Sequence, residues 1–359
     1  MTLKQYVQKY GEFDFKELPF NDVDGLILSL VSYIEFQGIV PKGNIKKVPL
    51  YKASNLFFKK YTPKEIKKMA PTFIRKLVLL FQVMATTKRY KDILLYNYVK
   101  EVEQDTQFGA VCMILSDETL FISFEGTDDS ISGWKEDCQM AYQFPVLAQK
   151  KAGEYLKKNI SIFGPRVRIG GHSKGGNLAM ASYLLVGVLT RSKIIRIYNN
   201  DGPGFRKKEY ESIGYQKMEK KLTMIVPEES LVGMFFRHPT NYQVVKSSSY
   251  SLFQHDGLSW LVDATSFQEG KISKRSKRLE KRIFQWIDSY DDEERKKIVL
   301  SLFSIVEGAG VKGLSELRIT KINKIIALIK ENKNMDKETR KFLLNAFKKL
   351  LLFKEEKKA

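Results

Sequence analysis

Cysteine and histidine are scarce in this sequence. Its 359 residues include two cysteines, Cys112 and Cys138, and three histidines, at positions 172, 238 and 255. Two cysteines cannot build a disulfide framework, and they fit a reducing cytosol. The histidines are too scattered to suggest a metal-binding cluster. We therefore expect no structural disulfides, no metal and no other cofactor.

Long apolar runs are also missing. No stretch of about 18 uninterrupted apolar residues occurs, so we expect no membrane-spanning helix. The first residues, Met1–Tyr6, lack the apolar core and the small-residue cleavage site of a signal peptide. The sequence predicts a cytoplasmic protein and permits peripheral contact with a membrane.

Acidic residues are outnumbered by basic ones. The chain has 61 Lys and Arg against 41 Asp and Glu, which gives a formal net charge of +20. Such a charge favours anionic partners, among them nucleic acid, anionic lipid and acidic substrates. No recognisable nucleic-acid-binding module accompanies it, so we expect no specific nucleic acid partner. A lysine-rich proteome would produce the same charge without any specific meaning.

The apolar residues, 43% of the chain, indicate a globular protein with a large core. We expect residues 1–20 to be an irregular lead-in, followed by helices after the Asn21 cap and over 63–86. The pattern then changes to contiguous strands, which predicts that the sheet begins antiparallel. The expected strands are 94–99, 108–115, 120–124, the run before residue 171, 193–198, 222–226 and 242–245.

Helices are expected between the later strands, over 145–158, 179–188 and 205–220. Helices that alternate with apolar strands imply a largely parallel sheet covered on both faces. The predicted fold class is therefore α/β.

One short stretch organises the chain. Arg168–Ala179 is predicted to form a strand, a sharp turn and a helix, with Ser173 at the apex of the turn. Gly171-x-Ser173-x-Gly175 is the nucleophile-elbow pattern of α/β-hydrolases, in which a tight turn needs neighbours without Cβ atoms. A plain glycine-rich turn between strand and helix is the alternative. We predict that Ser173 is a nucleophile.

Two positions are candidates for an oxyanion hole. Acyl transfer builds negative charge on a carbonyl oxygen, and this charge needs about two backbone donors. The Lys174 amide, directly after the serine, is the first candidate. The second is an amide in the Gly126–Thr127 turn, with the Thr127 hydroxyl assisting. A polar turn without function is the alternative for this segment.

His255 is the candidate base. A serine hydroxyl needs a histidine to take its proton and a carboxylate to orient that histidine. His255 follows the last predicted strand and is expected in a loop, where its alternative role is to cap the next helix. His172 lies inside the elbow and is expected to pack. His238 has no motif around it and is expected to be structural or exposed.

Three carboxylates compete to be the acid. Asp201 leaves the strand after the elbow strand in an Asp-Gly-Pro-Gly turn, and Glu228 and Glu229 leave the next strand. Asp256 adjoins the histidine and is expected to point elsewhere. We favour Asp201, with an Asx turn that only holds the corner as its alternative. Sites in open α/β sheets lie at the carboxyl ends of strands, where we expect five residues: Thr127, Ser173, Asp201, Glu228 and His255.

Several segments together resemble a known family. They are Pro19–Asn21, Phe124–Thr127, Trp134-x-x-Asp137, Gly171–Asn177, Asn200–Phe205, Ser230-x-Val232-Gly233 and Gln254–His255. They are similar to the class 3 lipase group, and more closely to the Mbeg1-like branch of bacterial lipase-like proteins. The resemblance covers roughly residues 15–265. It implies an α/β-hydrolase fold and a serine acyl-ester hydrolase with Ser173 as nucleophile and His255 as base.

Two positions depart from the family pattern. Glu125 stands where lipases usually carry arginine before the Gly-Thr turn. Ser230 stands where those lipases place the aspartate of the triad. Because of the second departure, we favour Asp201, from the preceding strand, over the other carboxylates as the acid of the triad.

The character of the sequence changes after residue 268. Residues 271–359 hold 24 Lys and Arg against 13 Asp and Glu, a net charge of +11. Apolar residues at helical spacing predict four helices, one through Ile287, one from Asp291 to Ile305, and two near 314–332 and 336–354. We therefore divide the chain into a hydrolase domain, 1–268, and a basic helical region, 269–359. These helices either dock on an anionic membrane surface or form a solvated face on a structural appendage.

The sequence thus predicts an α/β-hydrolase with an all-helical C-terminal region. Its expected substrates are carboxylic esters of small molecules or lipids, cleaved by a Ser-His-acid triad through an acyl-enzyme. The alternative is a catalytically weak or inactive hydrolase-fold protein that binds anionic membrane or partner surfaces.

Overall fold

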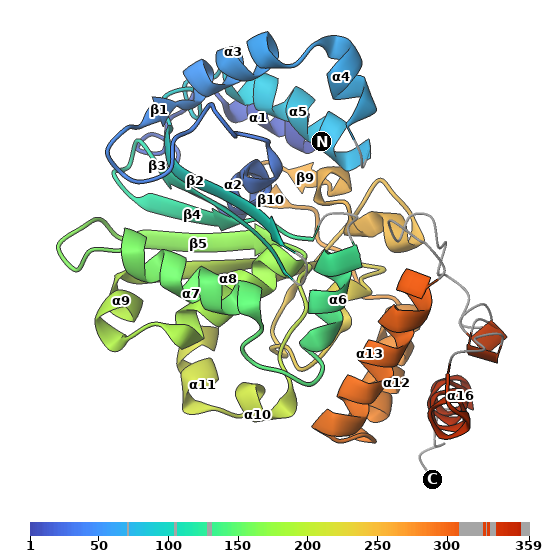
Figure 1. The fold of residues 1–359 in the computed structure, drawn as a ribbon. Coiled ribbons are helices and arrows are strands. Elements are labelled where there is room, and N and C mark those ends of the chain that lie inside the picture. The colour runs from blue at the N-terminus through green and yellow to red at the C-terminus, as the bar shows by residue number, and fades with distance from the viewer. Residues whose placement is uncertain are drawn as a thin grey trace.

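A single large sheet forms the centre of the part of the chain that the computed structural model describes: residues 1–69, 72–103, 106–127, 131–308, 326–327, 329–330 and 335–352. Within these residues the sheet has eight strands, which neighbour one another in the order of the sequence (Figure 1). They are β1 (Val48–Pro49), β2 (Leu94–Glu103), β3 (Thr106–Ile114), β4 (Leu120–Phe124), β5 (Val167–His172), β6 (Ile194–Asn200), β7 (Leu222–Pro227) and β8 (Gln243–Val245).

The sheet begins antiparallel and continues parallel. The pairs from β1 to β4 are antiparallel, and those from β4 to β8 are parallel, which confirms both predictions. In register, Phe124 lies beside Gly171 and His172 lies beside Asn200. The carboxyl ends of β4, β5 and β6 therefore meet at one edge, so the residues that follow these strands are neighbours.

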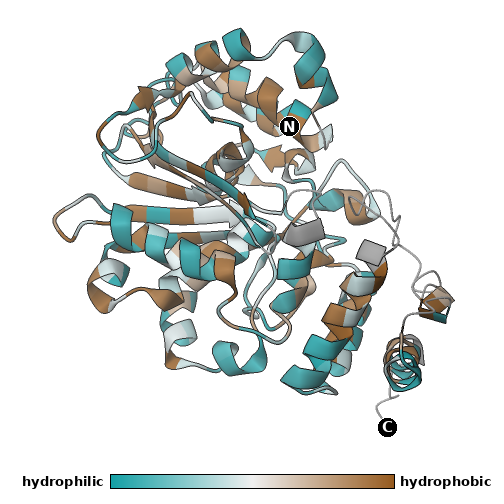
Figure 2. Cartoon of the chain, in the orientation of Figure 1, coloured by the Kyte–Doolittle hydropathy of each residue, from teal (hydrophilic) through white to brown (hydrophobic). Residues whose placement is uncertain are grey.

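Helices cover both faces of this sheet. On one face lie α1 (Leu3–Tyr10), α2 (Asp22–Leu30), α3 (Leu50–Lys60) and α5 (Thr72–Met84), and on the other α7 (Leu147–Asn159), α8 (Lys174–Leu185) and α11 (Ile213–Glu219). Alternate side chains of β3 enter the two cores: Val111 and Met113 join the first, Ala110 and Cys112 the second. The outer side of α7 is hydrophilic, as Figure 2 shows. This layered arrangement is the predicted α/β-hydrolase fold.

The helix α2 begins at the predicted cap. The Asn21 side chain accepts hydrogen bonds from the amides of Val23 and Asp24, and Asp24 accepts one from the Asn21 amide. This reciprocal arrangement satisfies amides that the first helical turn leaves without partners. Gly25 lets the helix approach the sheet, because a Cβ there would lie 2.7 Å from the Tyr198 ring.

The first 20 residues are not irregular throughout, so that prediction was wrong. The helix α1 begins after Thr2, whose hydroxyl accepts from the Gln5 amide. Its apolar residues Leu3, Tyr6 and Val7 share one face and are buried. The helix has eight residues, about two turns, and so short a segment carries little periodic signal.

Several further elements were not predicted or are divided differently. The helix expected over 63–86 is two helices, and the one expected over 205–220 is also two. The first pair is α4 (Pro63–Lys68) and α5, and the second is α10 (Lys207–Tyr210) and α11. The remaining described elements of the sheet region are η1 (Val31–Tyr33), α6 (Ile131–Gln139), α9 (Val188–Lys193), η2 (Val232–Met234), η3 (Ser251–His255), η4 (Gly257–Ser259), β9 (Val262–Asp263) and β10 (Ser266–Phe267).

Three helices are described in the C-terminal region: α12 (Lys274–Asp288), α13 (Asp292–Gly308) and α16 (Lys337–Leu352). Ile298, Leu343 and Phe347 belong to their shared core, and the Trp286 indole donates to the Ala346 carbonyl at 2.8 Å. These three match predicted helices, whereas the one expected near 314–332 falls largely outside the described residues. No helix in the described ranges is long and apolar enough to cross a bilayer.

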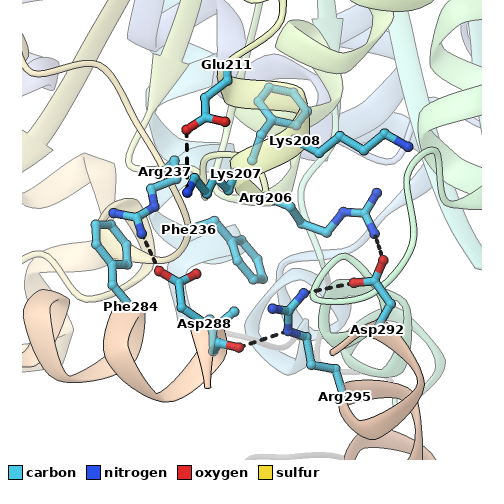
Figure 3. A pocket seen from close by; sticks show the side chains of 12 residues that line it. Arg206, Lys207, Lys208, Glu211, Phe236, Arg237, Phe284, Asp288, Asp292 and Arg295 are labelled. Carbon is cyan, nitrogen blue, oxygen red and sulfur yellow. Dashed lines mark hydrogen bonds and ion pairs between the residues drawn. The ribbon is translucent and has the colours of Figure 1, made fainter. Parts of the chain in front are cut away.

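Ion pairs join α12 and α13 to the sheet region (Figure 3). Asp292 at the start of α13 lies 3.1 Å from Arg206, and Asp288 at the end of α12 pairs with Arg237. The Arg237 guanidinium also lies over the Phe284 ring. These residues line a hollow of about 420 Å³. Because carboxylates already hold these guanidinium groups, we interpret the hollow as a joint between two regions.

Candidate active site

Ser173 occupies the turn between β5 and α8. Its backbone has φ 58° and ψ −132°, a conformation that side chains rarely adopt, and its amide donates to the Asn200 carbonyl at 3.0 Å. The flanking glycines have a steric reason. A Cβ on Gly171 would lie 2.2 Å from the Gly175 backbone, and one on Gly175 would lie 2.1 Å from the Phe124 carbonyl oxygen. The turn therefore has the strained strand-to-helix geometry that the sequence predicts.

Asp201 is the carboxylate that meets His255. Its Oδ2 lies 2.7 Å from His255 Nδ1, and the side chain is fully buried. The other oxygen, Oδ1, accepts from the Ser230 hydroxyl at 2.5 Å and from the Gly233 amide at 3.1 Å. Ser230, which departs from the family pattern, thus supports the carboxylate of the neighbouring strand.

The competing carboxylates are engaged elsewhere. Glu228 accepts from the Lys271 amide at 3.1 Å, and Glu229 lies 3.7 Å from Arg275. Asp256 caps η4 by accepting from the Leu258 amide. None of the three forms a described contact with His255, as expected for Asp256.

The contact with Asp201 fixes the His255 ring through its first nitrogen, Nδ1. Because a carboxylate only accepts hydrogen bonds, Nδ1 carries the hydrogen, and Nε2 of the neutral ring is left with its lone pair. His255 and Ser173 line the same cavity. Among the described residues the Ser173 hydroxyl has no hydrogen-bond partner, and catalytic contacts in a site without substrate are often long. His255 lies in the short helical turn η3 rather than in an open loop.

His172 packs against His255. Its Nε2 lies 2.7 Å from the His255 carbonyl oxygen, and the two rings are 4.7 Å apart. Burial, followed by the electrostatic interaction with His255, lowers the pKa of His172 to about 3. The ring is therefore neutral near pH 7, with its hydrogen on Nε2. His172 packs as predicted, and it also holds the backbone of the candidate base.

The candidate oxyanion turn is fixed through a side chain. The Thr127 hydroxyl donates to Asp137 Oδ2 at 2.5 Å, so it is not aimed at a substrate oxygen. The expected assistance from this hydroxyl is therefore absent here, whereas the Thr127 amide stays a candidate donor. Burial raises the pKa of the Asp137 carboxyl. Gly126 must be glycine, because a Cβ there would lie 2.0 Å from the Tyr33 hydroxyl.

The burial of the Lys174 side chain was not predicted from the sequence. It points into the protein, with its Nζ 2.6 Å from Glu136 Oε2 and 3.6 Å from Asp137 Oδ1. Lysine after a serine in a turn is usually exposed. The signal that could have found it is the neighbouring pair of acids in a segment whose family motif includes Asp137.

A cavity of about 970 Å³ opens beside Ser173. Most of its wall is apolar and comes from η1, α3, α5, α6 and η3. The aromatic members of the wall include Tyr33, Phe57, Phe73, Trp134, Tyr250 and Phe253. Tyr250 and Phe253 are 74% and 64% exposed, so η3 presents aromatic rings at the rim.

Charged side chains also line this cavity. Lys100 lies 3.0 Å from Glu125 and 3.6 Å from Glu35, and Lys76 lies 3.2 Å from Asp256. Glu125, the departure before the Gly-Thr turn, is almost fully buried in this network. Its side chain fits beside Gly109, where a Cβ would lie 2.1 Å from a Glu125 oxygen.

No metal-binding group is found in the part of the chain that the structure describes, where no three His, Cys, Asp or Glu converge. His238 is buried, with Nε2 3.0 Å from Glu280 of α12. It joins the sheet region to the C-terminal helices and lies outside the cavity.

Two solved structures match part of this chain. One is a fungal lipase–inhibitor complex, described as a model for interfacial activation in lipases; it has 14% identity and a TM-score of 0.31 over 44% of this chain. The other is M37 lipase, with 16% identity and a TM-score of 0.33 over 60% of this chain. This chain covers 66% of the fungal lipase, slightly less than two thirds, and 78% of M37 lipase.

Curated proteins give no match to this chain. A family model does: the model described as Mbeg1-like matches residues 84–304, which is more than half of the sequence. The matched range includes the elbow, Asp201, His255, the helix α12 and most of α13. The chain belongs to the Mbeg1-like family.

Proposed function

We propose that this protein is a serine acyl-ester hydrolase. The observation that carries the proposal is the 2.7 Å contact between His255 and the buried Asp201, beside a serine held at positive φ in a nucleophile elbow. A serine hydroxyl is a weak nucleophile at its own pKa, so it needs a base that a carboxylate orients. These three groups stand in the order nucleophile, acid, histidine that α/β-hydrolases use.

The proposed reaction begins when Ser173 Oγ attacks the ester carbonyl carbon and its proton passes to His255 Nε2. Asp201 stabilises the imidazolium, and the amides of Lys174 and Thr127 donate to the oxyanion. His255 then gives the proton to the leaving alkoxide, which leaves an acyl-enzyme. Water, deprotonated by His255, attacks the acyl carbonyl, and collapse of this second intermediate releases the acid and restores Ser173.

The proposed substrate is an ester with a sizeable apolar part, such as a lipid ester. The cavity beside Ser173 holds about 970 Å³ and is lined mainly by apolar and aromatic side chains. Each methylene buried there contributes about 0.8 kcal/mol to binding. The charged pairs of Lys76 and Lys100 give the cavity a few polar points that help to orient such an ester.

A fluorophosphonate probe and a soluble p-nitrophenyl ester test this proposal. We expect the probe to label Ser173, identified by peptide mass spectrometry, because only an activated hydroxyl reacts with it. Ser173→Ala should lower kcat/KM at least about a thousandfold. Ser182→Ala is the matched control, since Ser182 lies in α8, the helix that follows Ser173, and its hydroxyl donates to the Ala179 carbonyl. Full turnover by Ser173→Ala would refute the proposal.

A binding protein that keeps the hydrolase frame is the second candidate. The sequence feature in its favour is Ser230, which stands where related lipases carry the acid of the triad. The contact between Asp201 and His255 weighs against it, because Asp201 supplies a carboxylate from the preceding strand. Folded wild-type protein that binds long-chain esters, yet neither reacts with the probe nor turns over, would favour this candidate.

A further inference from the structure

A buried ion pair lies directly behind the proposed oxyanion site. The Lys174 side chain is 1% exposed and the Glu136 side chain is fully buried, with 2.6 Å between Nζ and Oε2. Lys174 also donates to the Gln107 carbonyl at 3.2 Å. Burying such a pair costs hydration energy of both ions. The proposed proton transfers use neither charge, so the pair has another role.

Glu136 gathers donors from several elements around the elbow. Its Oε1 accepts from the Thr106 hydroxyl at 2.8 Å and from the Ala148 amide at 2.7 Å. Its Oε2 accepts from Lys174 and from the Gln107 amide at 3.3 Å. These donors belong to β3 and to the first turns of α7 and α8, while Glu136 itself belongs to α6. One carboxylate therefore ties four elements together.

Both proposed oxyanion donors are attached to this network. The first is the amide of Lys174 itself, so the anchored side chain fixes the residue that donates. The second, in the Gly126–Thr127 turn, is held from two sides. Gln107 Nε2 donates to the Gly126 carbonyl at 3.3 Å, and the Thr127 hydroxyl donates to Asp137, the neighbour of Glu136 on α6.

We propose that Lys174 and Glu136 are positioning residues whose ion pair sets the separation of the two oxyanion donors. The proposal rests on the proposed function of this site. Neither charged group touches the substrate; each acts through the backbone that it holds. A displacement of about 1 Å can cost on the order of a hundredfold in rate. Because the oxyanion forms only during reaction, kcat carries the effect and KM does not.

Three variants separate positioning from simple stabilisation. Lys174→Met and Glu136→Gln each leave one buried charge without its partner, so we expect a lower melting temperature and a kcat reduced about 10- to 100-fold. The double variant Lys174→Met/Glu136→Gln removes both charges, and the glutamine amide oxygen can still accept from Thr106 and Ala148. We expect its melting temperature to return toward the wild-type value, while kcat stays at least tenfold low and KM stays within twofold.

A matched control lies at the start of α10, where Arg206 is the cap and Glu209 belongs to the first turn. Arg206 and Glu209 form a mostly buried pair at 2.7 Å that does not line the cavity. Arg206→Met/Glu209→Gln should change the melting temperature but leave kcat as it is. The measurement is steady-state hydrolysis of a soluble p-nitrophenyl ester by the full chain, below the melting temperature of each variant.

Two results would overturn the positioning role. One is a double variant that regains wild-type kcat together with wild-type stability; the other is folded Glu136→Gln with wild-type kcat. Fluorophosphonate labelling of the wild type keeps this test distinct from the proposed function. If the probe labels the wild type and Glu136→Gln keeps wild-type kcat, only the positioning role of the ion pair is overturned. If the wild type neither reacts with the probe nor hydrolyses the ester, both the positioning role and the proposed function are overturned.

Discussion

The carboxyl edge of the sheet and the C-terminal helices use charged residues in opposite ways. At the edge, Asp201 is fully buried and accepts from His255, Ser230 and Gly233. On α12, the basic side chains Lys274, Lys277, Arg278 and Lys281 are exposed. A buried charge with fixed partners acts at short range in a low dielectric, whereas exposed charges are screened within about 8 Å at physiological salt. The fixed charge of Asp201 can therefore orient the His255 ring, whereas the exposed charges of α12 can attract an anionic surface only when it comes close.

The backbone shows the same contrast. Ser173 and Asp201 have φ of 58° and 52°, and such strained residues cost about 1–3 kcal/mol each. Neighbouring elements hold both in place through the backbone bonds to Asn200 and Ile225. No residue described in α12, α13 or α16 has a positive φ. The other described non-glycine residues with positive φ, Asn97, Glu118, Phe236, Ser251 and Ala264, also lie outside these three helices. Strained backbone is thus absent from the described C-terminal helices, and the edge holds two of the strained residues.

Replacing the buried acid gives the largest expected effect. Asp201→Asn keeps the size of the side chain but can donate to His255 Nδ1, which stabilises the wrong tautomer of the ring. We expect kcat to fall about 10²- to 10⁴-fold with a smaller change in KM. Glu228→Gln is the matched control after the end of the next strand, and its kcat should stay within twofold of the wild-type value. Steady-state kinetics checks both, and equal losses in the two variants would contradict the assignment.

The choice of Asp201 shows what the sequence could predict. Strand order placed Asp201, Glu228 and Ser173 at one edge, and the Asp-Gly-Pro-Gly turn suggested a fixed side chain. The sequence could not say which carboxylate reaches the histidine, because that depends on where η3 folds back over the edge. Nor could it predict that Ser230, which follows the end of β7, donates a hydrogen bond to Asp201 and so supports this carboxylate.

Acid stability offers a test of burial at the edge. The folded pKa of His172 is about 3, below the value of about 6.5 expected when unfolded. Between these values the unfolded chain binds a proton that the folded chain does not, so stability falls as the pH falls through this window. The loss amounts to about 3 kcal/mol by pH 4.

His172→Gln removes the titrating group and keeps an amide that can donate to the His255 carbonyl. We expect the variant to be less stable than wild type at pH 7 but to lose about 3 kcal/mol less between pH 7 and pH 4. Urea unfolding at the two pH values measures the difference. Parallel losses in the two proteins would show that His172 is open to solvent or charged in the fold.

The parts of the fold that escaped prediction are those with little periodic signal. The strands β2 to β8 and most of the long helices had apolar patterns and were predicted, whereas the two-residue strands β1, β9 and β10 and the helix α3 were not. The helix α1 is short, and α6 carries Glu136 and Asp137, which look like exposed acids because their partners lie far along the chain. Lys174 and Glu136 are 38 residues apart, and only the packing of α6 beside β3 brings them together. Such pairs follow from tertiary structure.

The smallest effect on turnover is expected on α12. We expect kcat/KM for a soluble ester to stay within twofold when glutamine replaces all four basic residues, Lys274, Lys277, Arg278 and Lys281. The reason is that solvent and salt screen exposed charges over the distance to Ser173. We propose that these side chains instead attract an anionic membrane, at up to about 1 kcal/mol each. Sedimentation with vesicles containing anionic lipid should then fall in the variant, with neutral vesicles as the control. Unchanged sedimentation would show that this side of α12 is only a solvated face. A large loss of soluble-ester turnover would show that these exposed charges act on the site, as the buried charges at the edge do.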